Sequence, residues 1–199
     1  MKAITERSRR NAGNQLARWI SNVAHPFATL TLLVAVLAIR QPYGHATQSV
    51  LLVVIVVLLP VAVLMFRQVR RKRWSNADAS KPSERPVLFL AALGGMVASL
   101  SWLRLKDPHS CLMQGMFVVG MFLLLAALLT RWIKLSLHVA FAALTATTLS
   151  LIGSWVGYLL IAVVPLVFWS RLALARHRLH ELAVGLALGA FTGFLLVHL

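Results

Sequence analysis

Residues 182–199 read LAVGLALGAFTGFLLVHL, an apolar run with glycines at positions 185, 189 and 193. Its length approaches the ~20 residues that a helix needs to cross the hydrocarbon core of a bilayer. Glycines four residues apart share one face of a helix, where they let a neighbouring backbone approach closely in lipid. The sequence therefore predicts a membrane helix that packs tightly, through this glycine face, against a helical bundle.

The rest of the chain has the composition of an integral membrane protein. Of its 199 residues 59% are hydrophobic, and the mean hydropathy is +0.80. Because lipid cannot satisfy open sheet edges, helices are the expected spanning elements. We expect an all-α polytopic transmembrane helical bundle with six core spans and an N-terminal apolar segment, about seven in total. The other apolar runs occupy residues 24–39, 49–66, 87–103, 112–130, 135–152 and 155–169.

We expect two parts of unequal size. Residues 1–23 form a basic N-terminal segment, for which an interfacial helix and a frayed tail both stay open. Residues 24–199 form a single transmembrane domain, whose motif-bearing part is 112–199.

The net charge of +15 follows the expected topology. With seven spans, the N-terminus and loops 67–86, 131–134 and 170–181 share one side and hold 17 of the 20 Lys and Arg residues. The positive-inside rule makes that side cytoplasmic. Topology and anionic lipid head groups therefore explain the charge, and we expect no nucleic-acid partner. We place the protein in the bacterial inner (cytoplasmic) membrane.

Residues 170–181, SRLALARHRLHE, are a polar cluster between two apolar runs. Ionisable side chains at the edge of a bilayer are costly and typically mark a functional site. Within the cluster, Glu181 follows His177 by four residues, so both lie on one face of a helix. A carboxylate in that position can orient an imidazole for chemistry.

A second polar cluster, RWIKLSLH at residues 131–138, opens the fifth of the apolar runs that follow the N-terminus. A hairpin of two spans separates it from Ser170 and returns the chain to the same membrane face. The two clusters are therefore expected to converge. Together they supply cations that can clamp phosphate oxygens, one imidazole to attack phosphorus and another to protonate the departing oxygen. Most of the rate enhancement in phosphoryl transfer comes from such positioning and charge stabilisation.

The chain resembles the type 2 phosphatidic acid phosphatase superfamily of membrane phosphatases. The family's third motif is Ser-Arg, five residues, His, three residues, Asp, and Ser170, Arg171, His177 and Glu181 match it with Glu for Asp. Its second motif is Pro-Ser-Gly-His, and residues 135–138 keep the Ser and the His at that spacing.

The resemblance implies a role for each matched residue. His177 is the nucleophile that forms a phosphohistidine, Glu181 orients it, and His138 is the general acid. Ser136, Ser170 and Arg171 hold the phosphate, and neither a metal nor another cofactor is implied. The family's first motif, Lys, six residues, Arg-Pro, is absent before the second motif. We expect Lys134 and Arg131 to replace it as phosphate ligands, with Lys81 or Arg85 as the alternative.

The resulting prediction is a membrane-embedded lipid phosphatase that hydrolyses a phosphate monoester or diphosphate of phosphatidate, phosphatidylglycerophosphate or polyprenyl phosphate type. Its partners are the lipid phosphate and anionic head groups. The alternatives are a catalytically silent lipid-binding or assembly protein and a small lipid transporter. We assign no chemistry to the remaining histidines: His180 is treated as a surface or supporting residue, and the others as interfacial, namely His25, His45, His109 and His198.

Overall fold

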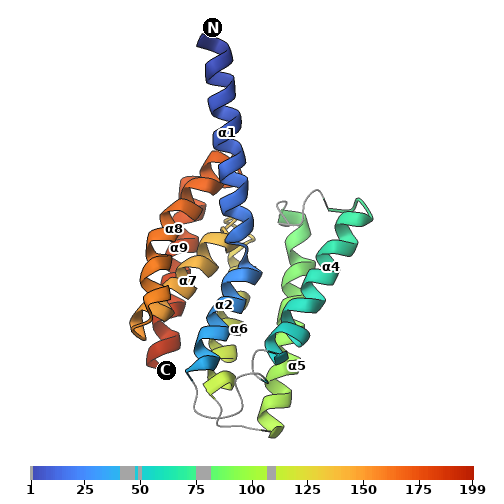
Figure 1. Cartoon of the computed structure of the whole chain (residues 1–199). Helices are drawn as coiled ribbons and strands as arrows, with labels where there is room; N and C mark the ends of the chain where they lie inside the picture. The colour runs from blue at the N-terminus through green and yellow to red at the C-terminus, as the bar shows by residue number, and fades with distance from the viewer. Residues whose placement is uncertain (1, 41–47, 49–50, 75–81, 107–110) are drawn as a thin grey trace. The chain divides into compact units, whose positions relative to one another are not determined.

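The computed structural model describes residues 2–40, 48, 51–74, 82–106 and 111–199, with side chains from residue 13 onward. The protein is all-helical, with 86% helix and no strand in the described ranges, as the sequence predicts. The elements in chain order are α1 (Lys2–Val23), α2 (Pro26–Ile39), the π-helical η1 (Val53–Leu58) continuing into α4 (Leu59–Arg70), the 3-10 turn η2 (Pro82–Glu84), α5 (Arg85–Lys106), α6 (Cys111–Leu129), α7 (Leu137–Leu151), α8 (Trp155–Ala173) and α9 (Leu179–His198) (Figure 1).

Among the described residues, five helical segments are long and apolar enough to cross a membrane. A sixth span is obtained if Gly13–Val23 and Pro26–Ile39, bent by 42° at a short break, count as one. The expected total of about seven is therefore not confirmed. The shortfall comes from α7, which has only 15 residues. The five segments are Val53–Arg70, Arg85–Lys106, Leu112–Leu129, Trp155–Ala173 and Leu179–His198.

The chain divides into two compact units. The first unit comprises residues 1–30 and 135–197, and the second comprises residues 31–134 and 198–199. All residues that match the family motifs belong to the first unit. The expectation of a single domain over residues 24–199 stays a prediction.

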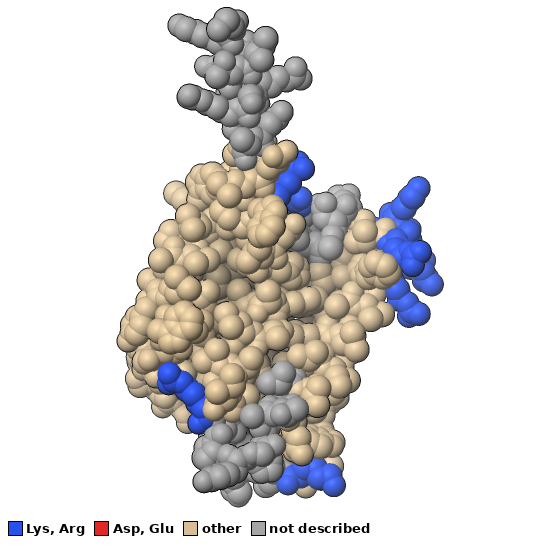
Figure 2. Space-filling view, in the orientation of Figure 1, with Lys and Arg blue, Asp and Glu red and all other residues tan. Residues whose placement is uncertain are grey.

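In the second unit, α5 packs against both α6 and the segment formed by η1 and α4. The crossing with η1 is close, since a Cβ at Gly95 would lie 2.7 Å from the backbone oxygen of Val56. The last turn of α4 and the turn after it expose five cations, and Figure 2 shows the blue side chains gathered there. These residues are Arg67, Arg70, Arg71, Lys72 and Arg73.

The first unit is built around α7, of whose fifteen residues eleven are buried. Figure 1 shows α7, α8 and α9 side by side. The core is apolar and draws one or two residues from each element around it: Ala24, Val139, Ala142, Val167 and Leu182. Each of these lies within a few residues of a polar side chain discussed below. The apolar core of this unit is therefore built from residues that neighbour its polar residues in the chain.

The glycine face of α9 packs on the backbone of α7, which confirms the sequence-based prediction. A Cβ at Gly185 would lie 2.9 Å from the Ser136 oxygen, and a Cβ at Gly189 would overlap the backbone of Ala140. One turn further on, a Cβ at Gly193 would lie 2.6 Å from the Leu144 oxygen. Only glycine allows the two helix backbones to come this close.

The variant Gly189→Ala tests this contact. The added methyl group must push α9 away from α7, and overpacking of this kind costs about 1–3 kcal/mol. We expect a clear fall in the thermal unfolding temperature, measured by circular dichroism in detergent micelles. Gly94→Ala is the matched control, because a Cβ there meets nothing within 4 Å; it should be neutral or stabilise α5 by up to about 1 kcal/mol. Equal unfolding temperatures for the two variants would contradict the packing.

Candidate phosphate site

The turn between α8 and α9 has a defined backbone path. The Arg176 N–H donates to the Arg171 oxygen over 3.1 Å, and the Ala175 N–H donates to the Leu172 oxygen over 2.9 Å. This pair of bonds is a Schellman motif, whose left-handed residue is Ala175 with φ 51°. It reverses the chain immediately after the buried Arg171. As a result, His177 emerges close to the end of α8 instead of continuing along its axis.

Glu181 joins this turn to α9. Its Oε2 accepts a hydrogen bond from the Arg178 N–H and lies 3.0 Å from Nδ1 of His177. An ionised carboxylate is acceptor-only, so His177 carries its proton on Nδ1 and the lone pair of the neutral ring is on Nε2. Glu181 is the third residue of α9, where a glutamate that accepts the N-cap N–H also stabilises the helix start. One side chain therefore caps α9 and sets the tautomer of His177.

Arg171 is 2% exposed. Its Nη1 donates to Oγ of Ser21, in α1, over 2.7 Å. Sequence reasoning did not single out Ser21, which lies 150 residues away from Arg171 in the chain. No local pattern reports a contact of that kind. The buried guanidinium is therefore held in place by the N-terminal helix as well as by its own helix.

The start of α7 meets the start of α9. The Ser136 N–H donates to the Glu181 backbone oxygen over 3.3 Å. Ser136 is the N-cap of α7, yet its hydroxyl makes no capping bond. Both Oγ of Ser136 and Nε2 of His138 are buried without a hydrogen-bond partner within the described structure. Since an unpartnered buried polar atom is costly, these two atoms make this region a candidate site for a polar ligand.

The electrostatics around His138 are strongly positive. Burial lowers the pKa of His138 well below the ordinary value of 6.5, and the charge of Arg171 lowers it further. The imidazoles of His25 and His177 and the guanidinium of Arg176 act in the same direction. His138 is therefore neutral near pH 7 when no anion is bound. An anion in the site would reverse this effect, because a nearby negative charge favours the imidazolium.

The structure thus brings residues 135–138 of the second cluster together with residues 170–181, as the hairpin argument expects. Ser170 lies in the same unit, but its hydroxyl donates to the Val167 oxygen of its own helix over 2.7 Å. Arg178 and His180 are exposed, and Arg176 is half-buried.

The replacements expected for the first motif stay predictions, because they lie outside the first unit. Arg131 is exposed and Lys134 is half-buried, and both belong to the second unit, as does the buried Arg85. Lys81, together with His45 and His109, lies outside the described residues.

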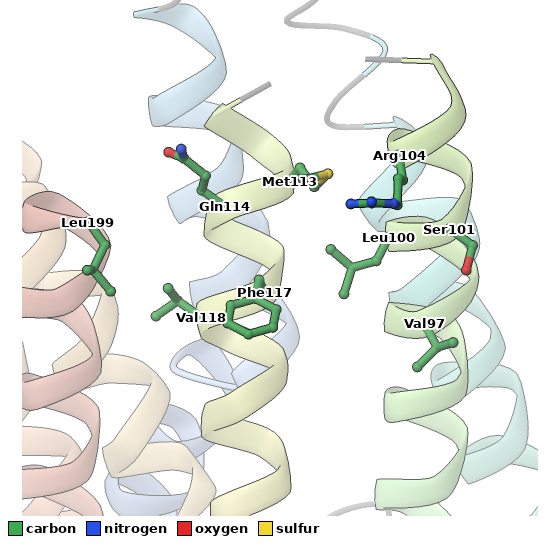
Figure 3. Close-up of a pocket in the computed structure, with 9 residues that line it drawn as sticks. All are labelled: Val97, Leu100, Ser101, Arg104, Met113, Gln114, Phe117, Val118 and Leu199. Atoms are coloured by element: carbon green, nitrogen blue, oxygen red, sulfur yellow. The ribbon is translucent and has the colours of Figure 1, made fainter. Parts of the chain in front are cut away.

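The second unit carries a separate pocket of about 570 Å³. Figure 3 shows that its wall consists mainly of apolar side chains from α5 and α6, with Ser101, Arg104 and Gln114 as polar members. None of the motif residues lines it. Among the described residues, no group of three His, Cys, Asp or Glu side chains is arranged to hold a metal ion.

Comparison of the chain with models of protein families, with curated proteins and with solved structures found no match. The geometry of the first unit and the motif spacing therefore carry the functional argument.

Substitution of Glu181 separates its two structural roles. Glu181→Ala removes the acceptor for the Arg178 N–H, and loss of a helix cap costs about 0.5–2 kcal/mol. Glu181→Gln keeps an acceptor at this position, so it should retain most of that stability while removing the negative charge beside His177. In micelles, the wild type and Glu181→Gln should have similar thermal unfolding temperatures, and that of Glu181→Ala should be lower. Equal destabilisation by both substitutions would mean that the charge, not the cap, stabilises α9.

Proposed function

We propose that the protein is a membrane-embedded lipid phosphatase of the type 2 phosphatidic acid phosphatase kind. The observation that carries the proposal is the convergence of a carboxylate-oriented imidazole, a buried guanidinium and two unpartnered buried polar atoms. These belong to His177, Arg171, Ser136 and His138. Arginine, a hydroxyl and imidazole are the groups expected around a phosphate. The N-terminus of α7 adds backbone N–H groups to the same region.

The proposed reaction proceeds in two steps. Nε2 of His177 attacks phosphorus with its lone pair, the bond to the lipid oxygen breaks, and His138 gives that oxygen a proton. Water then attacks the phosphorus of the phosphohistidine and passes a proton to His138. The bond between phosphorus and Nε2 of His177 breaks, so phosphate is released and His177 is restored. Throughout both steps, Glu181 accepts a hydrogen bond from the Nδ1–H of His177 and stabilises the positive charge that develops on that ring. Arg171 balances the charge on the phosphoryl oxygens.

In this reaction, the lowered pKa of His138 links its protonation to the binding of substrate. A general acid must be protonated before the leaving oxygen departs, whereas His138 is neutral near pH 7 in the absence of an anion. A phosphate group supplies the negative charge that raises its pKa, so the proton is taken up together with the substrate. The rate at saturating substrate should therefore fall at high pH, where His138 loses this proton even in the complex.

The proposed substrate is a lipid phosphate whose head group enters from the membrane interface while its tail stays in the bilayer. The class includes phosphatidate, phosphatidylglycerophosphate and polyprenyl phosphates, as monoesters or diphosphates. We propose that the site faces the cytoplasm in a bacterial inner membrane, a sidedness supported by the positive-inside rule applied to the charges along the chain. A site on that face suits a biosynthetic step.

A catalytically silent lipid-binding protein is the competing function. It is favoured by the absence of the first motif and by the fact that Glu181 caps α9 and Ser21 holds Arg171 without any reaction. A small lipid transporter is a weaker alternative, because His138, at one end of α7, is the only ionisable residue of this helix. The buried polar groups farther along it are the hydroxyls of Thr145 and Thr148, which already donate to backbone oxygens. Phosphate release separates an enzyme from both.

We expect purified wild-type protein in nanodiscs to release phosphate from short-chain phosphatidate. His177→Ala should abolish release, and His138→Ala should lower it by about 10²–10⁴-fold, the usual contribution of a general acid. The measurement is inorganic phosphate released per mole of protein. Activity should persist in the presence of a chelator.

His180→Ala is the matched control for these substitutions, because His180 lies in the same turn but is exposed. It should retain activity. Radiolabelled lipid phosphate should also leave acid-labile label on the wild type and on Glu181→Gln, but not on His177→Ala. Equal phosphate release by the wild type and by both histidine variants would refute the mechanism.

Cysteine labelling tests the proposed sidedness. Ser170 is fully buried and unsuitable for labelling, whereas His180 and Arg73 are exposed. In a Cys111→Ser background, cysteines at these two positions should react with a membrane-impermeant maleimide only in inverted vesicles. A cysteine at Leu105, which is 84% exposed near the C-terminal end of α5, should react in intact cells. Labelling of His180→Cys in intact cells would place the site on the outer face.

A further inference from the structure

The break between α1 and α2 lies against the candidate phosphate site. Pro26 begins α2, and a residue that precedes proline is disfavoured in helical conformation, so the helix is interrupted at His25. The interruption is short, because the Thr29 N–H already donates to the His25 oxygen over 3.1 Å. Ser21, which holds Arg171, lies one helical turn before His25. Two consecutive turns of the N-terminal chain therefore face the same site.

His25 stands edge-on to His138. The two ring centroids are 5.2 Å apart and the rings are inclined by 82°. On its other side, the His25 ring makes an edge contact with Phe27 at 4.9 Å. The Phe27 N–H donates to Nδ1 of His25 over 3.3 Å, which fixes the ring and places the proton of the neutral form on Nε2. A half-buried, immobilised imidazole thus forms a wall against the buried ring of His138.

We propose that His25 is a positioning residue of the phosphate site, which holds the His138 ring in its plane and governs when His138 can carry a proton. This inference rests on the proposed function, since it assigns His25 to the same anion site. His25 has no counterpart in the motifs that the chain resembles. Its position before Pro26 suggests an interfacial residue, and only the contact with His138 indicates a different role.

The physical basis is repulsion between like charges in a buried site. A charge on His25 opposes a charge on His138, as do the charges of Arg171 and Arg176 from the end of α8 and the imidazole of His177 from the turn. Among the residues that the structure describes in the first unit, Glu181, at the start of α9, is the negative group, and it is engaged by His177. Two imidazolium rings beside two guanidinium groups are strongly disfavoured until an anion binds. His25 therefore makes proton uptake by His138 depend on the bound phosphate.

Two uncharged variants test the charge effect without any need for catalysis. His25→Phe keeps a ring for the edge contact, and His25→Gln keeps an acceptor for the Phe27 N–H. In ligand-free nanodiscs, NMR of ¹³C-labelled histidine rings follows the His138 signal, assigned by its loss in His138→Ala. We expect both variants to move the His138 titration midpoint upward by about half a pH unit or more. The control His180→Phe should leave the midpoint unchanged. An unchanged midpoint in both His25 variants would overturn the inference.

The positioning effect is read from kinetics. His25→Ala removes the wall, so kcat should fall about tenfold with KM little changed, because misorientation of an acid affects the chemical step. His25→Phe keeps a ring at this position, so kcat should fall less than in His25→Ala, with the high-pH limb of kcat displaced upward. A wild-type kcat in His25→Ala would count against positioning. Failure of the wild type to release phosphate would overturn the proposed function, whereas the NMR titration would still decide whether His25 controls His138.

Discussion

The close contact between the glycine face of α9 and the backbone of α7 is the constraint on which the first unit depends. Gly185 rests on the Ser136 carbonyl and Gly189 on Ala140, so the first turns of the two helices are brought side by side. That contact places the Glu181 oxygen within reach of the Ser136 N–H. It also brings the turn bearing His177 close to the start of α7, where His138 lies. The glycine contact between the two helix backbones, in the apolar region, therefore sets the geometry of the polar site at their first turns.

The polar site gathers guanidinium and imidazole side chains around His138. Arg171 is buried, His138 is buried and neutral near pH 7, and the nearby carboxylate of Glu181 is already engaged by His177 and by a backbone N–H. Buried polar groups are stabilised by partners, and here the Ser136 hydroxyl and the His138 Nε2 have none within the described protein. A phosphate group would supply acceptors and negative charge at once. In the proposed function, ligand binding and protonation of His138 are coupled for that reason.

Much of this site could be predicted from the sequence because its information is local. The four-residue separation of His177 and Glu181 predicts their contact, and the two-span hairpin predicts that the clusters meet. Ser21 and His25 could not be found in this way. Their partners, Arg171 and His138, lie more than a hundred residues away, and neither a serine in a basic helix nor a histidine before a proline has a distinctive pattern. Likewise, the capping role of Glu181 emerges only once the start of α9 is known.

The all-helical membrane character and the tight packing of residues 182–199 were determined by the sequence alone, because hydropathy and glycine spacing act within one helix. The number of spans was not. The run at residues 135–152 forms a helix of only 15 residues, and its burial comes from neighbouring helices that its own pattern does not specify. Only the tertiary structure brought the break between α1 and α2 against α7 and α8. The position of this break depends on how the faces of helices distant in the sequence fit together. Periodicity along one segment carries no information about which helix it will pack against.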